Sequence, residues 1–196
     1  MAQNRVNRLS LIAVDNFYSL GQSYGAQNNV VRLGDGFGIS FKTYDTVKRS
    51  GMKYEFLITN FEAYYSSVSP GGSLKVDDTH TTFNFIFPIL IMYQRRIEHW
   101  FCIGLGIGTV AGRDYYDENN NLLAYDSTDL KKIEFGKYWE GALLLDYDLN
   151  IQWTKRIATD FGFRYTNPVP FHQNDQVYPI NQGIAVGFKL GLSYKF

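Results

Sequence analysis

Hydrophobic and polar residues alternate along much of this chain with a period of two. The final segment is the clearest case: from Ile184 to Phe196 every second residue is apolar or aromatic, and the residues between them are small or polar. Successive side chains of a β-strand point to opposite faces, whereas a helix would spread them around its axis. The segment is therefore predicted to be a β-strand with one apolar face.

Other segments repeat the pattern, and we count about eight strands and no segment that predicts a helix. The clear segments are 157–165, 139–153, 101–111 and 83–93, and the weaker ones are 53–65, 30–44 and a first strand near 5–15. Asp35 interrupts the apolar positions of 30–44. In 53–65 the outer, apolar face is assigned to Leu57 and Thr59. Phe56 and Ile58 have the opposite parity, which suggests a bulge or an apolar contact in the lumen.

The register of two hairpins is predicted from tight turns between these strands. A turn at 95–96 pairs residues whose numbers add to about 192, so Ile91 faces Phe101 and the apolar faces of both strands coincide. The next tight turn places Asp146 near Arg164 on the polar face.

Strand length and loop length favour a membrane barrel over a soluble one. Strands of roughly 10–15 residues exceed the usual globular strand of about 5–6 and suit a tilted membrane strand of about 9–11. The expected long connections are 16–29, 66–80, 113–136 and 167–182, and the short ones are 45–52, 95–98 and 154–156. Such alternation is typical of outer-membrane barrels, with both termini on the short-turn side. The prediction is one all-β domain over 1–196: an antiparallel up-and-down transmembrane β-barrel.

Aromatic residues gather near the predicted strand ends, where a membrane barrel meets its two lipid–water interfaces. They are Tyr54, Tyr64, Tyr65, Tyr93, Trp100, Tyr138, Trp139, Trp153, Tyr165 and Tyr194.

The opposite parity of the strands carries charged and polar residues, which are expected to line the lumen. They are Arg32, Lys42, Asn84, Glu140, Asp146, Asp148, Asp160, Arg164 and Lys189. Isolated charges there would be costly, so opposite signs are expected to pair. The alternative is a soluble, lipocalin-like barrel with its apolar face inward, because parity alone does not separate inside from outside.

Composition narrows the class further. The 196 residues carry 19 Lys+Arg and 19 Asp+Glu, a net charge of zero, so nucleic acid is not an expected partner. One cysteine, Cys102, excludes an internal disulfide framework. No apolar run approaches the ~18–20 residues of a membrane helix.

The candidate chemistry is sparse. His80, His99 and His172 fall on predicted loops or turns and are interpreted as solvated. The GxGxxA string at 106–111 lies inside an alternating strand and opens no helix, so a dinucleotide site is not expected. No catalytic residue, metal site or cofactor is predicted.

The ending 191–196, with Tyr194 and the terminal Phe196, resembles the C-terminal assembly signal of bacterial outer-membrane proteins. The resemblance implies a small eight-stranded outer-membrane barrel, with the barrel-assembly machinery, membrane lipid and lipopolysaccharide as partners. A monomer is expected. The given sequence has no signal peptide and is interpreted as a mature chain.

The stretch 164–167 with 180–184 is similar to the C-terminal end of the lipid A 3-O-deacylase family. Arg164 and Thr166 stand where that family has its base His and nucleophile Ser, and arginine cannot act as a base at neutral pH. The favoured function is a non-enzymatic barrel acting through its long loops in adhesion, surface recognition or envelope integrity. The alternatives are an acyl hydrolase acting on lipid A or phospholipid, a small-solute pore, and the soluble ligand-binding barrel.

Overall fold

The computed structural model describes residues 5–18, 30–32, 34–69, 72–117, 119–123, 139–170 and 185–196. These residues form nine strands: β1 (Arg5–Tyr18), β2 (Val30–Arg32), β3 (Gly34–Asp45), β4 (Ser50–Ser69), β5 (Gly72–Gln94), β6 (Ile97–Tyr116), β7 (Trp139–Gln152), β8 (Ile157–Pro170) and β9 (Ala185–Lys195). No helix in the described part of the chain is long and apolar enough to cross a membrane.

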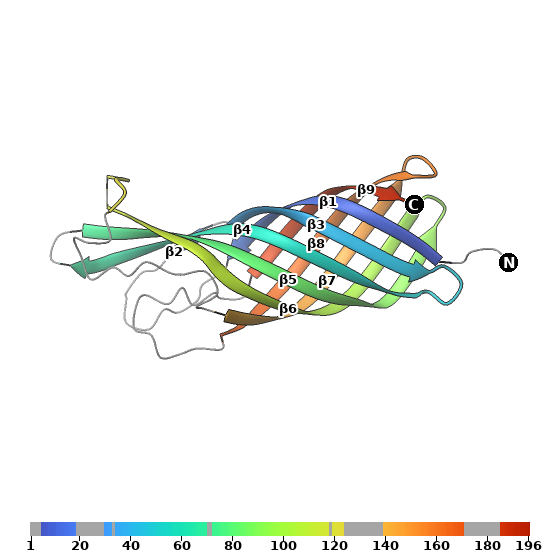
Figure 1. The fold of residues 1–196 in the computed structure, drawn as a ribbon, viewed down its shortest axis with the longest axis horizontal. Helices are drawn as coiled ribbons and strands as arrows, with labels where there is room; N and C mark the ends of the chain where they lie inside the picture. The colour runs from blue at the N-terminus through green and yellow to red at the C-terminus, as the bar shows by residue number, and fades with distance from the viewer. Residues whose placement is uncertain are drawn as a thin grey trace.

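The strands close into an antiparallel barrel (Figure 1). Neighbours in sequence are neighbours in the sheet, β1 pairs with β9, and β4 pairs with β5 to complete the ring. β2 and β3 both pair with β4, so they occupy one position and the barrel has eight strands. The predicted up-and-down barrel is confirmed, and both described ends of the chain lie at the end of the short turns (Figure 1).

The short turns are held by local hydrogen bonds. In the turn 46–49, Oδ1 of Asp45 accepts hydrogen bonds from the backbone N–H groups of Val47 and Lys48, both at 2.8 Å. Those hydrogen bonds hold the pKa of the Asp45 carboxyl below its usual value. Arg49 and Arg95, at φ 53° and 56°, adopt the left-handed conformation that lets the chain reverse in so few residues.

Three adjacent strands extend the barrel on the opposite side from the short turns (Figure 1). β4, β5 and β6 have 20, 23 and 20 residues, whereas β1, β3, β7, β8 and β9 have 11 to 14. The predicted loop at 66–80 is therefore wrong, because β5 already begins at Gly72. The outward residues Lys75, Asp77 and Thr79 are polar, so this part of the strand carries no apolar alternation that the sequence could reveal.

A β-bulge in β5 reverses the predicted facing of its last residues. Pro88 pairs with Cys102 and Leu90 with Phe101, so Ile89 is the extra residue. Beyond the bulge Ile91 is fully buried, where the sequence placed it on the outer face. The predicted pairing of Ile91 with Phe101 is wrong for the same reason, and a proline inside a strand is the local signal for such a bulge.

The predicted facing of β4 is also wrong. Leu57 and Thr59 point inward and are 4% exposed each, while Phe56 points outward. Lys53 and Glu55 share the parity of Leu57, and charged groups cannot lie on an apolar outer face. The charges therefore decide which way the strand turns, and Leu57 packs inside with Ile12 and Val14.

Candidate functional site: an apolar outer surface around an ionic lumen

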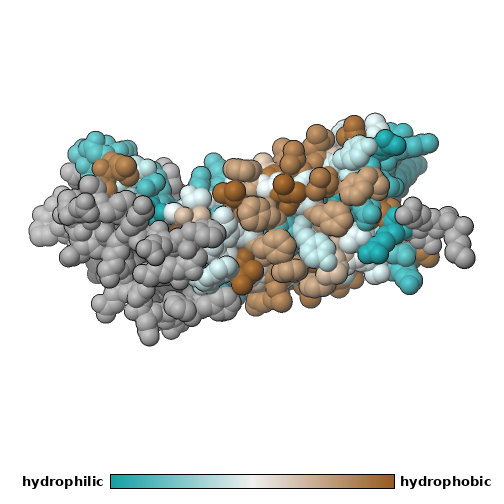
Figure 2. Space-filling view, viewed as in Figure 1, coloured by the Kyte–Doolittle hydropathy of each residue, from teal (hydrophilic) through white to brown (hydrophobic). Residues whose placement is uncertain are grey.

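The outer surface of the barrel carries a continuous apolar band. Figure 2 shows it across the middle of the visible face, with hydrophilic residues at the end of the short turns. Large apolar residues of this band that remain exposed include Leu9, Leu11, Phe37, Ile39, Phe56, Phe85, Phe87, Phe101, Ile103, Leu105, Leu143, Leu145, Phe161, Phe163, Phe188, Leu190 and Leu192. The apolar positions of the alternating pattern thus face outward. This arrangement excludes the alternative of a soluble barrel with an apolar interior.

The lumen, by contrast, is filled by charged side chains. Among the described residues, six Lys and Arg side chains are buried: Arg8, Lys42, Lys53, Arg113, Arg164 and Lys189. Six buried Asp and Glu side chains match them: Glu55, Asp78, Glu98, Asp146, Asp148 and Asp160. A buried charge is tolerated when it is paired and hydrogen-bonded, and this one-to-one balance meets that condition.

Lys53 lies at the centre of the network. Its ammonium group contacts Asp146, reaches Asp148 Oδ2 at 2.6 Å and Glu55 Oε1 at 3.1 Å, and is fully buried. Lys42 extends the network to Asp148 at 3.0 Å. One cation thus ties β4 to β7 across the interior of the barrel.

Two further cations close the central network from the other wall. Arg164 donates from Nε to Asp146 at 3.0 Å and from Nη2 to Glu55 at 2.5 Å. Lys189 Nζ lies 2.7 Å from both Asp146 and Asp148. The register pairs Asp146 with Arg164, which confirms the predicted hairpin.

A second group fills the lumen at the end of the short turns. Arg8 donates to Glu98 at 2.7 Å and contacts Asn150. The Tyr44 hydroxyl lies 3.0 Å from both Glu98 oxygens, and its ring meets Trp100 edge to face at 4.9 Å. Trp100 is fully buried, so its predicted place in an outer aromatic ring is wrong.

A third group lies at the opposite end, beyond the apolar band, which begins on β5 at Phe83. Arg113 donates to Asp78 at 2.5 and 2.6 Å, and the His80 ring lies 3.6 Å from Asp78 and 3.1 Å from Glu140. Burial opposes a charged imidazole there, but the two carboxylates outweigh it and raise the pKa of His80 to about 9. His80 is therefore a buried, charged link between β5 and β7, and its prediction as a solvated loop histidine is wrong.

Little space remains between these side chains. A cavity of about 10 Å³ lies beside Ser40, Lys42, Asp148 and Asp160, which is about the size of one water molecule. A Cβ added at Gly162 would come within 2.4 Å of Lys189 Cε and 2.8 Å of Asp148 Oδ1. At Gly162, therefore, neighbouring side chains already occupy the space that a larger residue would need.

The structure places the sequence-predicted lumen residues as follows. Lys42, Asp146, Asp148, Asp160, Arg164 and Lys189 come together in the central lumen, and Asn84 is buried on the same face. Glu140 lies apart from them, beside His80. The side chain of Arg32 and the whole of His172 lie outside the described residues. Within the described residues no group of three His, Cys, Asp or Glu is arranged to hold a metal ion.

Sequence reasoning missed six of the buried charges: Arg8, Lys53, Glu55, Asp78, Glu98 and Arg113. Lys53 and Glu55 alternate with the outward Tyr54 and Phe56, and this four-residue pattern was the available signal for the facing of β4. Arg8 and Glu98 lie close to strand ends, where an exposed position is the ordinary expectation for a charge.

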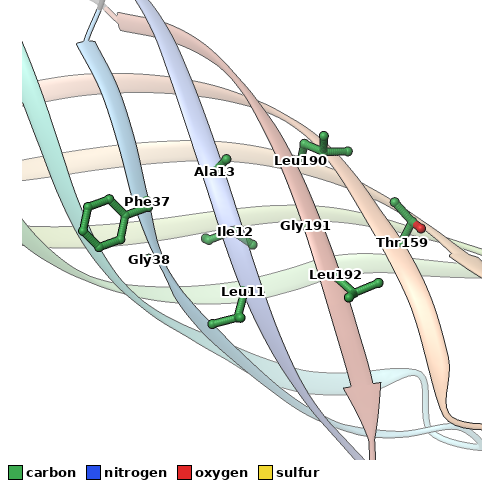
Figure 3. A pocket seen from close by; sticks show the side chains of 9 residues that line it. All are labelled: Leu11, Ile12, Ala13, Phe37, Gly38, Thr159, Leu190, Gly191 and Leu192. Atoms are coloured by element: carbon green, nitrogen blue, oxygen red, sulfur yellow. The ribbon is translucent and has the colours of Figure 1, made fainter.

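A shallow groove crosses the apolar band over β1 (Figure 3). Its floor is Ala13, and Phe37 of β3 and Leu190 of β9 stand on either side. This stretch has a volume of about 580 Å³. A second stretch of about 490 Å³ shares Ala13 and Leu190 and continues the groove to Asp15 and Asp35.

Comparison with solved structures identifies the fold. The outer membrane protein OprG of Pseudomonas aeruginosa aligns over 98% of this chain and 95% of its own, at 11% identity and a TM-score of 0.50. Neisserial surface protein A aligns over 99% and 98%, at 12% identity and a TM-score of 0.51. The chain has the fold of these outer-membrane β-barrels. No family model matches the sequence, and no curated protein is significantly similar to it.

Proposed function

We propose that this chain is an integral protein of the bacterial outer membrane, with a closed lumen and its activity on the extracellular side. The observation that carries the proposal is the opposition of the two faces: the outside is apolar and the inside is ionic and paired. A closed barrel satisfies its backbone hydrogen bonds between strands, so this arrangement is stable in hydrocarbon and unfavourable in water. Membrane lipid and lipopolysaccharide are then its immediate surroundings.

The orientation follows from the short turns, which face the periplasm in proteins of this architecture. The long connections and the extensions of β4, β5 and β6 then project outside the cell. Adhesion, surface recognition or envelope integrity through these segments is the role we favour, because exposed connections on a rigid scaffold are where binding residues concentrate.

The C-terminal strand supports assembly in this membrane. Tyr194 and Phe196 are 46% and 65% exposed and point away from the lumen, so the barrel-assembly machinery can contact them on the outer surface. The ring of Phe196 lies 6.3 Å from that of Phe41 on β3. We propose that the monomeric barrel is inserted through this strand.

Neither catalysis nor conduction has support in the lumen. Arg164, at the position of the deacylase base, is held by Asp146 and Glu55 and cannot accept a proton. The central network spans the lumen from β4 to β7, which leaves no room for a solute beside it.

The three tryptophans provide the test of membrane insertion. Trp139 and Trp153 are 46% and 60% exposed near opposite ends of the barrel wall, whereas Trp100 is buried in the lumen. Three single-tryptophan variants, with the other two changed to Phe, are refolded into vesicles whose lipids are brominated near the glycerol. Bromine should quench the fluorescence of Trp139 and Trp153 and leave Trp100 unquenched.

Equal fluorescence of all three variants in brominated and ordinary vesicles would contradict membrane insertion. Planar-bilayer recordings complete the test, because stable open channels would contradict the closed lumen. Loss of cell-surface binding after shortening the extensions of β4 and β5 would support the extracellular role, and unchanged binding would oppose it.

A further inference from the structure

Lysine and arginine side chains surround the end of the barrel that carries the short turns (Figure 1). Each of the three turns contains two consecutive cations, which are Lys48 and Arg49, Arg95 and Arg96, and Lys155 and Arg156. The fourth position of the ring, where β9 meets β1, adds Lys195 and Arg5. The strand order spaces these four positions evenly around the barrel, so the eight residues form a basic ring at this end.

The charges of the basic ring are not balanced by the chain itself. All of its side chains except Lys195 are exposed, and none forms an ion pair within the part of the chain that the structure describes. Arg5 donates to the Thr43 hydroxyl at 3.1 Å and Arg156 to the Tyr194 hydroxyl at 3.2 Å, and both of these partners are neutral. The charged groups of the lumen, by comparison, lie beside opposite charges. The difference points to an anionic partner outside the barrel.

The position of the basic ring indicates what that partner is. Val47, which is 69% exposed, directly precedes Lys48, and Ile157, which is 43% exposed, directly follows Arg156. The cations therefore lie at the edge of the apolar surface, where a headgroup layer of roughly 5–8 Å begins. The bond from Arg156 to Tyr194 agrees with this depth, because tyrosine is enriched at the level of the headgroups.

We propose that the basic ring binds the phosphate groups of anionic phospholipids in the periplasmic leaflet. The short turns face the periplasm in barrels of this architecture, and the leaflet on that side of the outer membrane consists of phospholipids. Phosphatidylglycerol carries a net negative charge and zwitterionic phospholipids carry none, so the ring enriches the anionic lipid around this end of the barrel. The inference rests on the proposed membrane location, since only an inserted barrel brings the ring to the headgroups.

Trp153 reports on the lipid at the basic ring, because it lies in the turn 153–156 and is 60% exposed. The single-tryptophan variant that retains Trp153 is refolded into phosphatidylcholine vesicles that contain a constant minority of phosphatidylglycerol. In one set the phosphatidylglycerol is brominated, and in the other an equal amount of phosphatidylcholine is brominated. Bromine on phosphatidylglycerol should quench Trp153 at least about two-fold more strongly. The excess should disappear at about 1 M salt, where the Debye length is about 3 Å.

Variants of the turn separate charge from packing. K155Q/R156Q removes both charges beside Trp153 and should abolish the excess quenching, whereas K155R/R156K retains the charges and should retain the excess. K75Q is the matched control, because it removes a lysine from the extension of β5 at the opposite end of the barrel and should leave the excess unchanged.

Equal quenching by the two brominated lipids would overturn the proposal, as would an excess that survives in K155Q/R156Q or at 1 M salt. Absence of quenching by either brominated lipid would instead refute the membrane location. The failure of the lipid preference and the failure of the proposed function are therefore distinguishable.

Discussion

At the scale of single residues, the interior is specified by charge and size together. Gly162 leaves room for Lys189 and Asp148, and each lumen cation has a carboxylate within reach. A substitution inside the barrel is therefore expected to act through a neighbour that cannot move away.

Gly162→Ala tests the packing of the lumen. The new methyl group meets Lys189 and Asp148, so the free energy of unfolding should fall by about 1–3 kcal/mol, the usual cost of overpacking. Gly112→Ala is the matched control, because its added Cβ has nothing within 4 Å. Urea titration of both variants in detergent measures the difference, and equal stability would mean that the lumen is loosely filled.

His80 predicts a pH dependence of stability. Its pKa is about 9 in the folded protein against 6.5 for an ordinary histidine, so the charged form contributes stability that is fully present below pH 6.5. That contribution is lost as the pH rises through 9. The wild type should therefore lose a few kcal/mol more than His80→Gln between pH 6 and pH 10, in urea unfolding monitored by tryptophan fluorescence.

The groups that face His80 are Asp78 on its own strand and Glu140 on β7, with Arg113 of β6 bonded to Asp78. His99→Gln serves as a control, because His99 contacts the Tyr147 hydroxyl and has no carboxylate partner in the described part of the chain. Parallel curves for wild type and His80→Gln would show that the imidazole is not charged in the barrel.

At the scale of strands, one extra residue decides the facing of a whole segment. The bulge at Ile89 lets both Ile89 and Leu90 point outward, at 69% and 46% exposure, and turns Ile91 into the lumen. A regular strand could not place all three in this way, since facing alternates strictly.

Deletion of Ile89 is expected to be tolerated. Pro88 and Leu90 then become consecutive opposite Cys102 and Phe101, so every other residue of β5 keeps its face and its partner. Deletion of Ile103, in the regular part of β6, turns every residue on one side of the deletion to the opposite face of the sheet. This deletion should prevent folding. Heat-modifiable gel mobility after refolding distinguishes the two, and failure of both deletions would contradict the bulge.

At the scale of the molecule, the ionic lumen is one cooperative unit. Lys53 by itself contacts three carboxylates, and among the described residues six buried Lys and Arg side chains face six buried Asp and Glu side chains. Removal of one member leaves carboxylates buried without their partner, which costs more than the loss of an isolated surface pair.

Lys53→Met should accordingly lower the free energy of unfolding by about 3–5 kcal/mol. Lys155→Met, in the exposed turn 153–156, makes the same chemical change without a buried partner and should shift it by less than about 0.5 kcal/mol. Urea unfolding in the same detergent compares them, and a similar effect of both changes would contradict a cooperative network.

The alternation of residues by itself determined the class of fold, since a period of two over long segments is incompatible with helices. It also determined the strand count, the short turns and the hairpin that joins Asp146 to Arg164. It could not determine which face of the barrel was outside, because alternation is the same in either direction. Only the closed ring brought Lys53, Arg164 and Lys189 from three strands to the same carboxylates, and this pairing makes an ionic interior stable. Pairing with neighbouring strands likewise decided the bulge at Ile89 and the length of β4 to β6. The sequence of a single strand carries no information on that pairing.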